Sequence, residues 1–324
     1  MGNPMKLHRG KRSPVGLIPS VSLVCLSLFL AISIRGASLA AAPSGGPASP
    51  LTDAQQSVLE KIFTISQVPQ SLPTDEQPPV LQVKVANLIQ EFATVNGIKL
   101  VPIPAGNFLM GSPADEAGRL HNEGPQTRVT ITQDFFLGAT DVTQAQWTAV
   151  MGNNPSKFVG AQRPVDRVPW TDAVAFCRKV TDKERAAGRL PDGYAYTLPT
   201  EAQWEYACRA GTTGPYAGDL DAMAWYENNS GLKSHPVATK QPNAWGLFDM
   251  HGNQCEWCLD WFAATLPGGT VTDPVGPASG FFRAARGGGW GYSTARCRST
   301  SRFSFVPQVH FEGLGFRLAF SVVR

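Results

Sequence analysis

The sequence predicts an α+β domain that is irregular and rich in loops, with short helices and small antiparallel sheets. Helical signals are strong at only two places after Leu100, namely 171–187 and 200–209. Elsewhere, short apolar runs are separated by turns rich in Gly, Pro, Asn and Asp, which is typical of short strands. All eight tryptophans lie between Trp147 and Trp290, and about 220 residues can bury a substantial core. A single large domain is therefore expected.

Both predicted helices have recognisable ends. Each segment is framed by a threonine that can cap its start and a glycine that can end it: Thr171 and Gly188 in the first helix, Thr200 and Gly211 in the second. The predicted strands include the apolar runs at 127–131, 135–137 and 316–322.

The first 42 residues have the features of a signal peptide. Four basic residues between Lys6 and Arg12 precede an apolar run from Val15 to Ile34, and alanine-rich sequence follows. The run is also about long enough to span a bilayer, so an uncleaved anchor is the alternative. The chain is expected to be secreted, or to lie in the periplasm or cell envelope, with membrane contact only through an uncleaved leader.

The charge of the mature chain argues against nucleic acid as a partner. The full sequence has 28 basic and 25 acidic residues. The leader contains five of the basic side chains and no acidic one, so 23 basic and 25 acidic residues remain after cleavage. A slightly acidic chain lacks the basic surface that binds a phosphate backbone.

Residues 43–97 predict a linker with short helices. The linker begins with a stretch rich in Ala, Pro, Ser and Gly, which is typical of a flexible tether. Apolar residues then recur at helical spacing in 53–65 and 80–95, on either side of a proline-rich break. The favoured interpretation is a helical spacer. Packing on the main domain, or a partner contact, is the alternative.

The segment 246–261 gathers acidic, amide, cysteine and indole groups around one glycine. Carboxylates at Asp249 and Glu256 flank backbone carbonyls that a glycine turn can aim inward. These are the hard oxygen ligands that calcium selects. The alternative is that both carboxylates accept hydrogen bonds from loop amides without an ion.

Further blocks surround this segment. They are Val101–Ser112, Leu198–Tyr206 (LPTEAQWEY), Arg286–Gly288 and Gly313–Arg317 (GLGFR). In order and spacing they resemble the formylglycine-generating enzyme, or sulfatase-modifying factor, family. The resemblance runs from about residue 100 to 320 and implies a fold related to C-type lectins over 98–324. It also implies a calcium site formed by the carboxylates of Asp249 and Glu256 and the main-chain carbonyls of Gly252 and Gln254.

The family's oxidases oxidise a sulfatase cysteine with Cu(I) held by two cysteines, and this chain departs from that pattern. The second cysteine is present as Cys297, but Tyr292 stands at the first. Gly289 replaces a serine of the motif, and Cys255 replaces a tryptophan. A phenol is a hard oxygen donor with a pKa near 10, so it cannot replace a thiolate toward Cu(I). The standard copper chemistry is expected to be lost.

The cysteines leave two interpretations open. A relocated pair, Cys255 with Cys297, would bind copper or another metal, or form a redox disulfide, and make the chain a divergent oxidase. Alternatively, Cys297 is structural, with Cys208 as its first candidate disulfide partner, because an exported protein meets oxidising surroundings. Cys255 and Cys258 have the spacing of a redox motif but lack its βαβ context, so structural roles are favoured.

The closing region offers a candidate recognition surface. Trp290, Tyr292, Arg296 and Arg302 are candidates to line a groove, since aromatic side chains beside arginines suit contact with a peptide or glycan. For Trp290 and Tyr292, a packed core cluster is an equal alternative. The favoured function is an exported, calcium-stabilised module that binds a peptide, protein or glycan, with a sulfatase among the candidate partners. Arg286 and Arg317 are expected first as buried partners of carboxylates or carbonyls.

Overall fold

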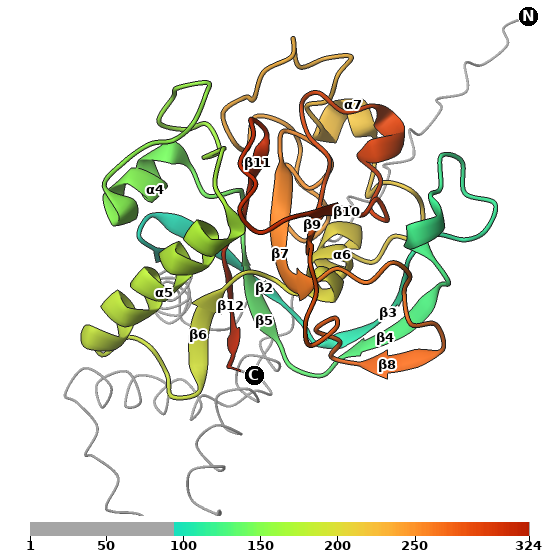
Figure 1. The fold of residues 1–324 in the computed structure, drawn as a ribbon, viewed down its shortest axis with the longest axis horizontal. Coiled ribbons are helices and arrows are strands. Elements are labelled where there is room, and N and C mark those ends of the chain that lie inside the picture. The colour runs from blue at the N-terminus through green and yellow to red at the C-terminus, as the bar shows by residue number, and fades with distance from the viewer. Residues whose placement is uncertain (1–93, 324) are drawn as a thin grey trace, which may run out of the picture. The chain divides into compact units, whose positions relative to one another are not determined.

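The computed structural model describes residues 94–323 and contains short helices and short strands, as predicted (Figure 1). The helices are α4 (Gln144–Met151), α5 (Trp170–Ala186), α6 (Glu201–Arg209) and α7 (Leu220–Met223), with 3-10 turns at His121–Glu123 and Thr294–Arg296. No helix between residues 94 and 323 is both long and apolar enough to cross a membrane.

Twelve strands form three small sheets in this part of the chain. The five-stranded sheet has the order β1 (Thr94–Val95), β2 (Ile98–Ile103), β5 (Phe135–Gly138), β12 (Ala319–Val322), β6 (Tyr194–Thr197). The four-stranded sheet has the order β10 (Phe303–Phe305), β9 (Arg283–Arg286), β7 (Cys255–Trp261), β11 (Leu314–Gly315). The three-stranded sheet has the order β3 (Gly106–Met110), β4 (Thr127–Ile131), β8 (Thr270–Thr272). Most pairings are antiparallel, as expected; β11 with β7 and β4 with β8 are parallel.

The two predicted helices are present as α5 and α6. The Thr200 side chain accepts a hydrogen bond from the Gln203 amide and caps α6, as the sequence indicated. Helix α5 instead begins at Trp170, one residue before the predicted start, with Pro169 at the cap position and no side-chain cap. Proline suits this position because its fixed φ and missing N–H match the requirements of a helix start.

Helix α4 was not predicted from the sequence. Its start is a full capping box, in which Thr143 and Gln146 exchange hydrogen bonds, and it ends at Gly152 with a φ of 84°. The Thr-x-x-Gln signal was therefore present. The apolar periodicity was absent because the helix is two turns long and Trp147 is its one buried hydrophobic residue.

The strand predictions are confirmed at 127–131 and 135–137. The run predicted for 316–322 is a strand only from Ala319 to Val322. Thr94 and Val95, placed at the end of a predicted helix, instead pair with β2. The rest of that predicted helix, the helix predicted for 53–65 and the predicted leader lie outside the described residues.

Strand β7 separates two hydrophobic clusters and lies at the centre of Figure 1. Cys255 and Trp257 pack in the first cluster, whereas Cys258 packs in the second. This division follows from strand geometry, because successive side chains point to opposite faces. The first cluster continues to α4 and α5, where the rings of Trp147 and Phe176 stack with centroids 5.6 Å apart.

Truncation of Phe316 is expected to destabilise the domain strongly. Its ring is fully buried and packs edge-on against Phe176, with centroids 5.4 Å apart. Phe316→Ala should lower the free energy of unfolding by about 3 to 5 kcal/mol, because a buried ring leaves a cavity. The matched control is Phe281→Ala, whose ring is 86% exposed, and it should change stability by less than about 0.5 kcal/mol. Equal effects in urea unfolding would contradict the described core.

Candidate functional site

The segment before β7 is a tight loop whose backbone is held in unusual conformations. Asp249 and Asn253 have φ angles of 59° and 61°, in the left-handed region where Asn and Asp are enriched. At Gly252, a Cβ atom would collide with the carbonyl oxygen of Trp225. The loop therefore needs a glycine at that position, and it aims several main-chain and carboxylate oxygens into the protein.

Glu256 forms a buried ion pair with Arg317. Its carboxylate accepts hydrogen bonds from Arg317 Nε at 2.6 Å and Nη2 at 2.7 Å, and from Trp204 Nε1 at 2.8 Å. Arg317 also donates to the carbonyl oxygens of Gly138 and Phe248. Both Glu256 oxygens are thus occupied by protein donors. The expectation that Arg317 is a buried ion-pair partner is confirmed.

The other predicted calcium groups are also hydrogen-bonded within the protein. Asp249 accepts from the Ala238 amide at 2.9 Å and from Asn253 Nδ2 at 3.4 Å. The Gly252 carbonyl accepts from the Gln254 amide. Burial raises the pKa of Asp249 to about 6. The hydrogen bonds to this carboxylate and the charge of Arg317 therefore do not offset the cost of burying its negative charge.

Asp141 joins this region and was missed by the sequence analysis. It is fully buried, and its Oδ1 accepts a hydrogen bond from Gln254 Nε2 at 3.3 Å. Burial first, and then the nearby charge of Glu256, raises the pKa of Asp141 well above its ordinary value. No local signal could have identified it, because Asp141 and Gln254 are 113 positions apart.

The calcium expectation fits this region in part. Glu256 does not fit as a ligand, because Arg317 and Trp204 occupy its oxygens. Among residues 94–323, no three His, Cys, Asp or Glu side chains converge as a metal-binding group. Hard oxygens are nevertheless abundant here, and within the described residues two buried acceptors, Asp141 Oδ2 and Gln254 Oε1, have no hydrogen-bond donor. Both are hard oxygens, the atom type that calcium prefers, but they fall short of the six to eight ligands that it takes.

Tyr292 packs against both hydrophobic clusters that contain the thiols of the proposed catalytic pair. It contacts the cluster that contains Cys255 and also the small cluster that contains Cys297. Both thiols are fully buried. Burial raises the pKa of Cys297 to about 12 and the pKa of Cys255 further, so both thiols stay protonated at neutral pH. Burial also raises the pKa of the Tyr292 phenol to about 12.

The predicted Cys208–Cys297 disulfide is not formed. The five cysteines of the described part of the chain are free thiols, namely Cys177, Cys208, Cys255, Cys258 and Cys297. The His251 ring lies between the predicted partners: the Cys208 sulfur is 3.7 Å from its Nε2, and its Nδ1 is 2.9 Å from the Cys297 carbonyl. His251 Nε2 accepts a hydrogen bond from the Ala217 amide. A neutral ring with its proton on Nδ1 can accept this bond and also donate to the Cys297 carbonyl.

The predicted recognition residues do not all lie together. Tyr292 packs edge-on against Phe303, and the guanidinium of Arg296 lies 4.3 Å above the same ring. Arg302 is instead buried and donates two hydrogen bonds to Glu201 at 2.6 and 2.8 Å. Arg302 therefore belongs to an internal ion pair, not to a groove.

A run of half-buried rings continues from this point. Phe305 stacks on Phe303, and Phe311 packs edge-on against Phe305 with centroids 5.1 Å apart. We call Tyr292, Phe303, Phe305 and Phe311 the aromatic strip. Trp290 lies nearby in the sequence and packs against Phe158. The partly exposed members, with Arg296, offer apolar area and a cation to a ligand.

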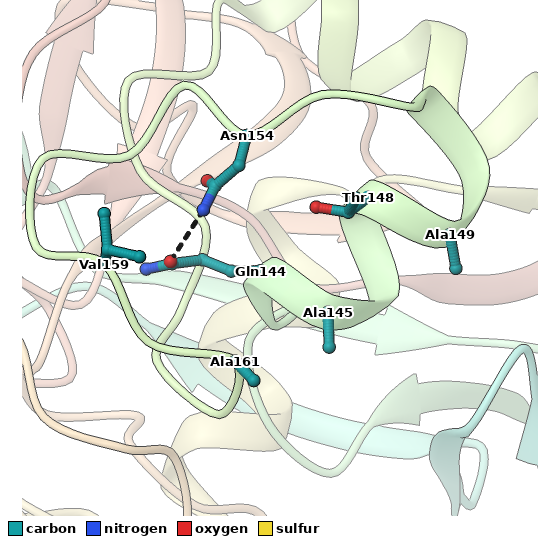
Figure 2. A pocket seen from close by; sticks show the side chains of 7 residues that line it. All are labelled: Gln144, Ala145, Thr148, Ala149, Asn154, Val159 and Ala161. Atoms are coloured by element: carbon teal, nitrogen blue, oxygen red, sulfur yellow. Dashed lines mark hydrogen bonds between the residues drawn. The ribbon is translucent and has the colours of Figure 1, made fainter.

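A shallow hollow of about 440 Å³ lies elsewhere, between α4 and the loop that follows it (Figure 2). Figure 2 shows that its two amides, Gln144 and Asn154, bond to each other. Its other lining residues are Ala145, Thr148, Ala149, Val159 and Ala161. The lining of this hollow therefore consists of small apolar side chains, one hydroxyl and two amides.

Comparison with known proteins finds a family match and several relatives. The sequence model of the sulfatase-modifying factor enzyme 1-like domain matches residues 85–322. The chaperone protein LppX of Paenibacillus barcinonensis is 32% identical over 243 residues, covering 60% of this chain and 81% of that protein. The formylglycine-generating enzyme of Mus musculus is 27% identical over 293 residues, covering 68% and 74%.

Solved structures share the fold. Variable protein 1 of Treponema denticola superposes with a TM-score of 0.62 at 35% identity, over 68% of this chain and 94% of that one. PvdO from Pseudomonas aeruginosa gives a TM-score of 0.61 at 25% identity, over 71% and 98%. The predicted fold class is thereby confirmed.

Alkylation should report the state of the thiols. At pH 8, a pKa of about 12 leaves Cys297 roughly one part in ten thousand ionised, and the thiolate is the reactive form. In the folded, unreduced protein, Cys297 should therefore resist iodoacetamide, and in denaturant all five described cysteines should react. Mass spectrometry of the peptides measures the extent of alkylation in the folded and in the denatured protein. A linked Cys208–Cys297 peptide would contradict the free-thiol arrangement.

Proposed function

Because this chain belongs to the sulfatase-modifying factor family, we propose that it keeps the family scaffold, has lost the standard copper chemistry and acts as an exported polypeptide-binding module. The observation that carries this proposal is the position of Tyr292, whose ring packs against both clusters that hold the candidate thiols. A phenol stands where the oxidases have a copper ligand. The scaffold is retained, but its catalytic pair is incomplete.

The protonation of the remaining groups supports the loss of oxidase activity. Cu(I) prefers soft thiolate ligands, and a thiol becomes a ligand only when it loses its proton. Burial raises the pKa of Cys297 to about 12, and the Tyr292 phenol is both hard and protonated at neutral pH. Copper binding at this position would have to overcome two unfavourable deprotonations.

A polypeptide is the favoured ligand of the module. The aromatic strip supplies apolar area, and Arg296 above Phe303 supplies a charge that can pair with a carboxylate or a carbonyl. The relative LppX is named as a chaperone, which supports a polypeptide over a glycan. A sulfatase is one candidate partner, because the family's oxidases act on a sulfatase cysteine.

We further propose that calcium stabilises the loop at 249–254 and that the protein works outside the cytoplasm. The buried carboxylate of Asp249 beside the carbonyls of this loop supports the ion, since calcium prefers oxygen ligands. The signal-like sequence of residues 1–42 supports export.

The rival function is a divergent oxidase that uses Cys255 with Cys297. The fact that favours it is that both thiols are free and that Tyr292 packs against both of the clusters that contain them. This pair would oxidise a cysteine of a substrate protein, with copper and oxygen, only if a conformational change opened the clusters that bury the two sulfurs.

Copper titration separates the two functions. Under reducing conditions, and in competition with a chromogenic Cu(I) chelator, the wild-type protein should bind no stoichiometric copper. Tyr292→Cys should gain one Cu(I) per chain, because it restores the second soft ligand beside Cys297. Tyr292→Ser is the matched control and should not gain copper. Stoichiometric copper in the wild type, lost in Cys255→Ser, would establish the oxidase instead.

Binding of an unfolded chain tests the module. The probe is reduced and carboxymethylated α-lactalbumin, and the measurement is fluorescence anisotropy with the wild type and with Arg296→Ala and Phe311→Ser. Each variant should weaken binding by about tenfold or more, which corresponds to about 1.4 kcal/mol. Phe281→Ser changes an exposed phenylalanine outside the aromatic strip and should bind as the wild type does. Binding of a glycan array without binding of the probe would overturn the polypeptide assignment.

A further inference from the structure

We propose that the polypeptide ligand binds as an added strand, with its main chain paired to the free edge of β10 and its side chains on the aromatic strip. This mode of binding rests on the polypeptide-binding function proposed above, and it defines the ligand more closely. The ligand is an extended chain in which apolar side chains alternate with polar ones and one carboxylate lies opposite Arg296.

Strand β10 lies at one edge of the four-stranded sheet. Its neighbour is β9, and the antiparallel pairing runs from Phe303 opposite Ala285 to Phe305 opposite Arg283. An edge strand turns alternate main-chain N–H and C=O groups away from its sheet. Within the part of the chain that the structure describes, no group outside β9 hydrogen-bonds the main chain of β10. The outward groups are therefore free to pair with a second strand.

Other sheet edges are closed by protein groups. At the opposite edge of the same sheet, the Leu314 carbonyl of β11 accepts a hydrogen bond from the Val168 amide. At the β6 edge of the five-stranded sheet, the Thr181 hydroxyl bonds both the carbonyl and the amide of Tyr196. The free edge at β10 thus differs from these two edges, and it lies beside the aromatic strip.

The face of β10 explains why an added strand would be held by its side chains as well. Phe303 and Phe305 both pack in the first hydrophobic cluster, and Trp257 packs edge-on against Phe305 with ring centroids 5.9 Å apart. Ser304 and Phe305 are half-buried, and Val306 after them is 44% exposed. A strand that continued the sheet would place every second side chain on this face, so apolar residues there would bury the exposed parts of the strip.

Arg296 supplies charge complementarity. Its guanidinium lies 4.3 Å from the centre of the Phe303 ring, and it forms no ion pair with any carboxylate that the structure describes. The neighbouring Arg298 and Arg302 are instead paired with Glu123 and Glu201. An unpaired guanidinium beside the free edge favours a chain that brings a carboxylate to it.

The alternative is that the strip binds side chains without any main-chain pairing. The probe that separates the two modes is a monomeric, fluorescently labelled peptide of about ten residues, in which valine alternates with threonine and one end is a glutamate. One version has N-methyl groups on the valine amides, and the other has them on the threonine amides. In an extended chain these two sets of amides face opposite edges, so an added strand uses one set and leaves the other in solvent.

Binding to the full mature chain is measured by fluorescence anisotropy. One methylated version should bind at least about tenfold more weakly than the parent peptide, because it loses main-chain hydrogen bonds and its methyl groups meet β10. The other version is the matched control and should bind within about twofold of the parent.

The carboxylate is tested by a second pair of changes. Replacing the peptide's glutamate by glutamine should weaken binding to the wild type by about two- to fivefold and should have no effect on binding to Arg296→Ala. The control protein is Arg185→Ala, which removes an exposed arginine of α5 and should keep the full dependence on the glutamate.

Three results would overturn strand addition. If both methylated peptides bind as the parent does, or if both lose affinity equally, the ligand is not held through one edge of its main chain. If the parent peptide does not bind while carboxymethylated α-lactalbumin does, an extended chain is not the form that is recognised. In each of these cases binding of α-lactalbumin leaves the polypeptide-binding function standing, whereas failure of both probes removes that function as well.

Discussion

The Glu256–Arg317 ion pair is the constraint on which the rest of the structure depends. It connects β7 to the segment before β12, and Arg317 also binds the carbonyls of Gly138 and Phe248. Removing one partner of a buried pair leaves an uncompensated charge, at a cost of about 3 to 5 kcal/mol. Both partners are therefore needed to hold β7, the segment before β12 and the loop before β7 in place.

This pair also determines the chemistry of its neighbourhood. Burial raises the pKa values of the Asp141 and Asp249 carboxyls, and the nearby charge of Glu256 adds to the effect. The region therefore combines one satisfied ion pair with two under-compensated acids. The calcium proposal rests on this chemistry, since hard oxygens suit a divalent cation better than a soft one.

The thiols illustrate how burial decides reactivity. Cys255 and Cys258 have redox spacing in the sequence, yet β7 is a strand and places them in different hydrophobic clusters. Cys208 and Cys297 are separated by the His251 ring. Thiols in apolar surroundings remain protonated and unreactive. The buried cysteines of the described residues therefore pack within the hydrophobic clusters as protonated thiols.

Local signals allowed several features to be predicted from the sequence. The cap at Thr200 and the strands at 127–131 and 135–137 follow from residues close together in the chain. The family and its fold follow from the order and spacing of several short blocks. Helix α4 had a usable signal, the Thr143–Gln146 capping box, but no apolar periodicity to support it.

What the sequence determined by itself is the type of chemical group at each position, including the phenol that replaces a thiolate. The tertiary structure alone decided which groups meet and which are buried. Arg302 pairs with Glu201 across 101 positions, and Asp141 meets Gln254 across 113. Such partners have no signature in the local sequence, because burial and pairing depend on segments that only folding brings together.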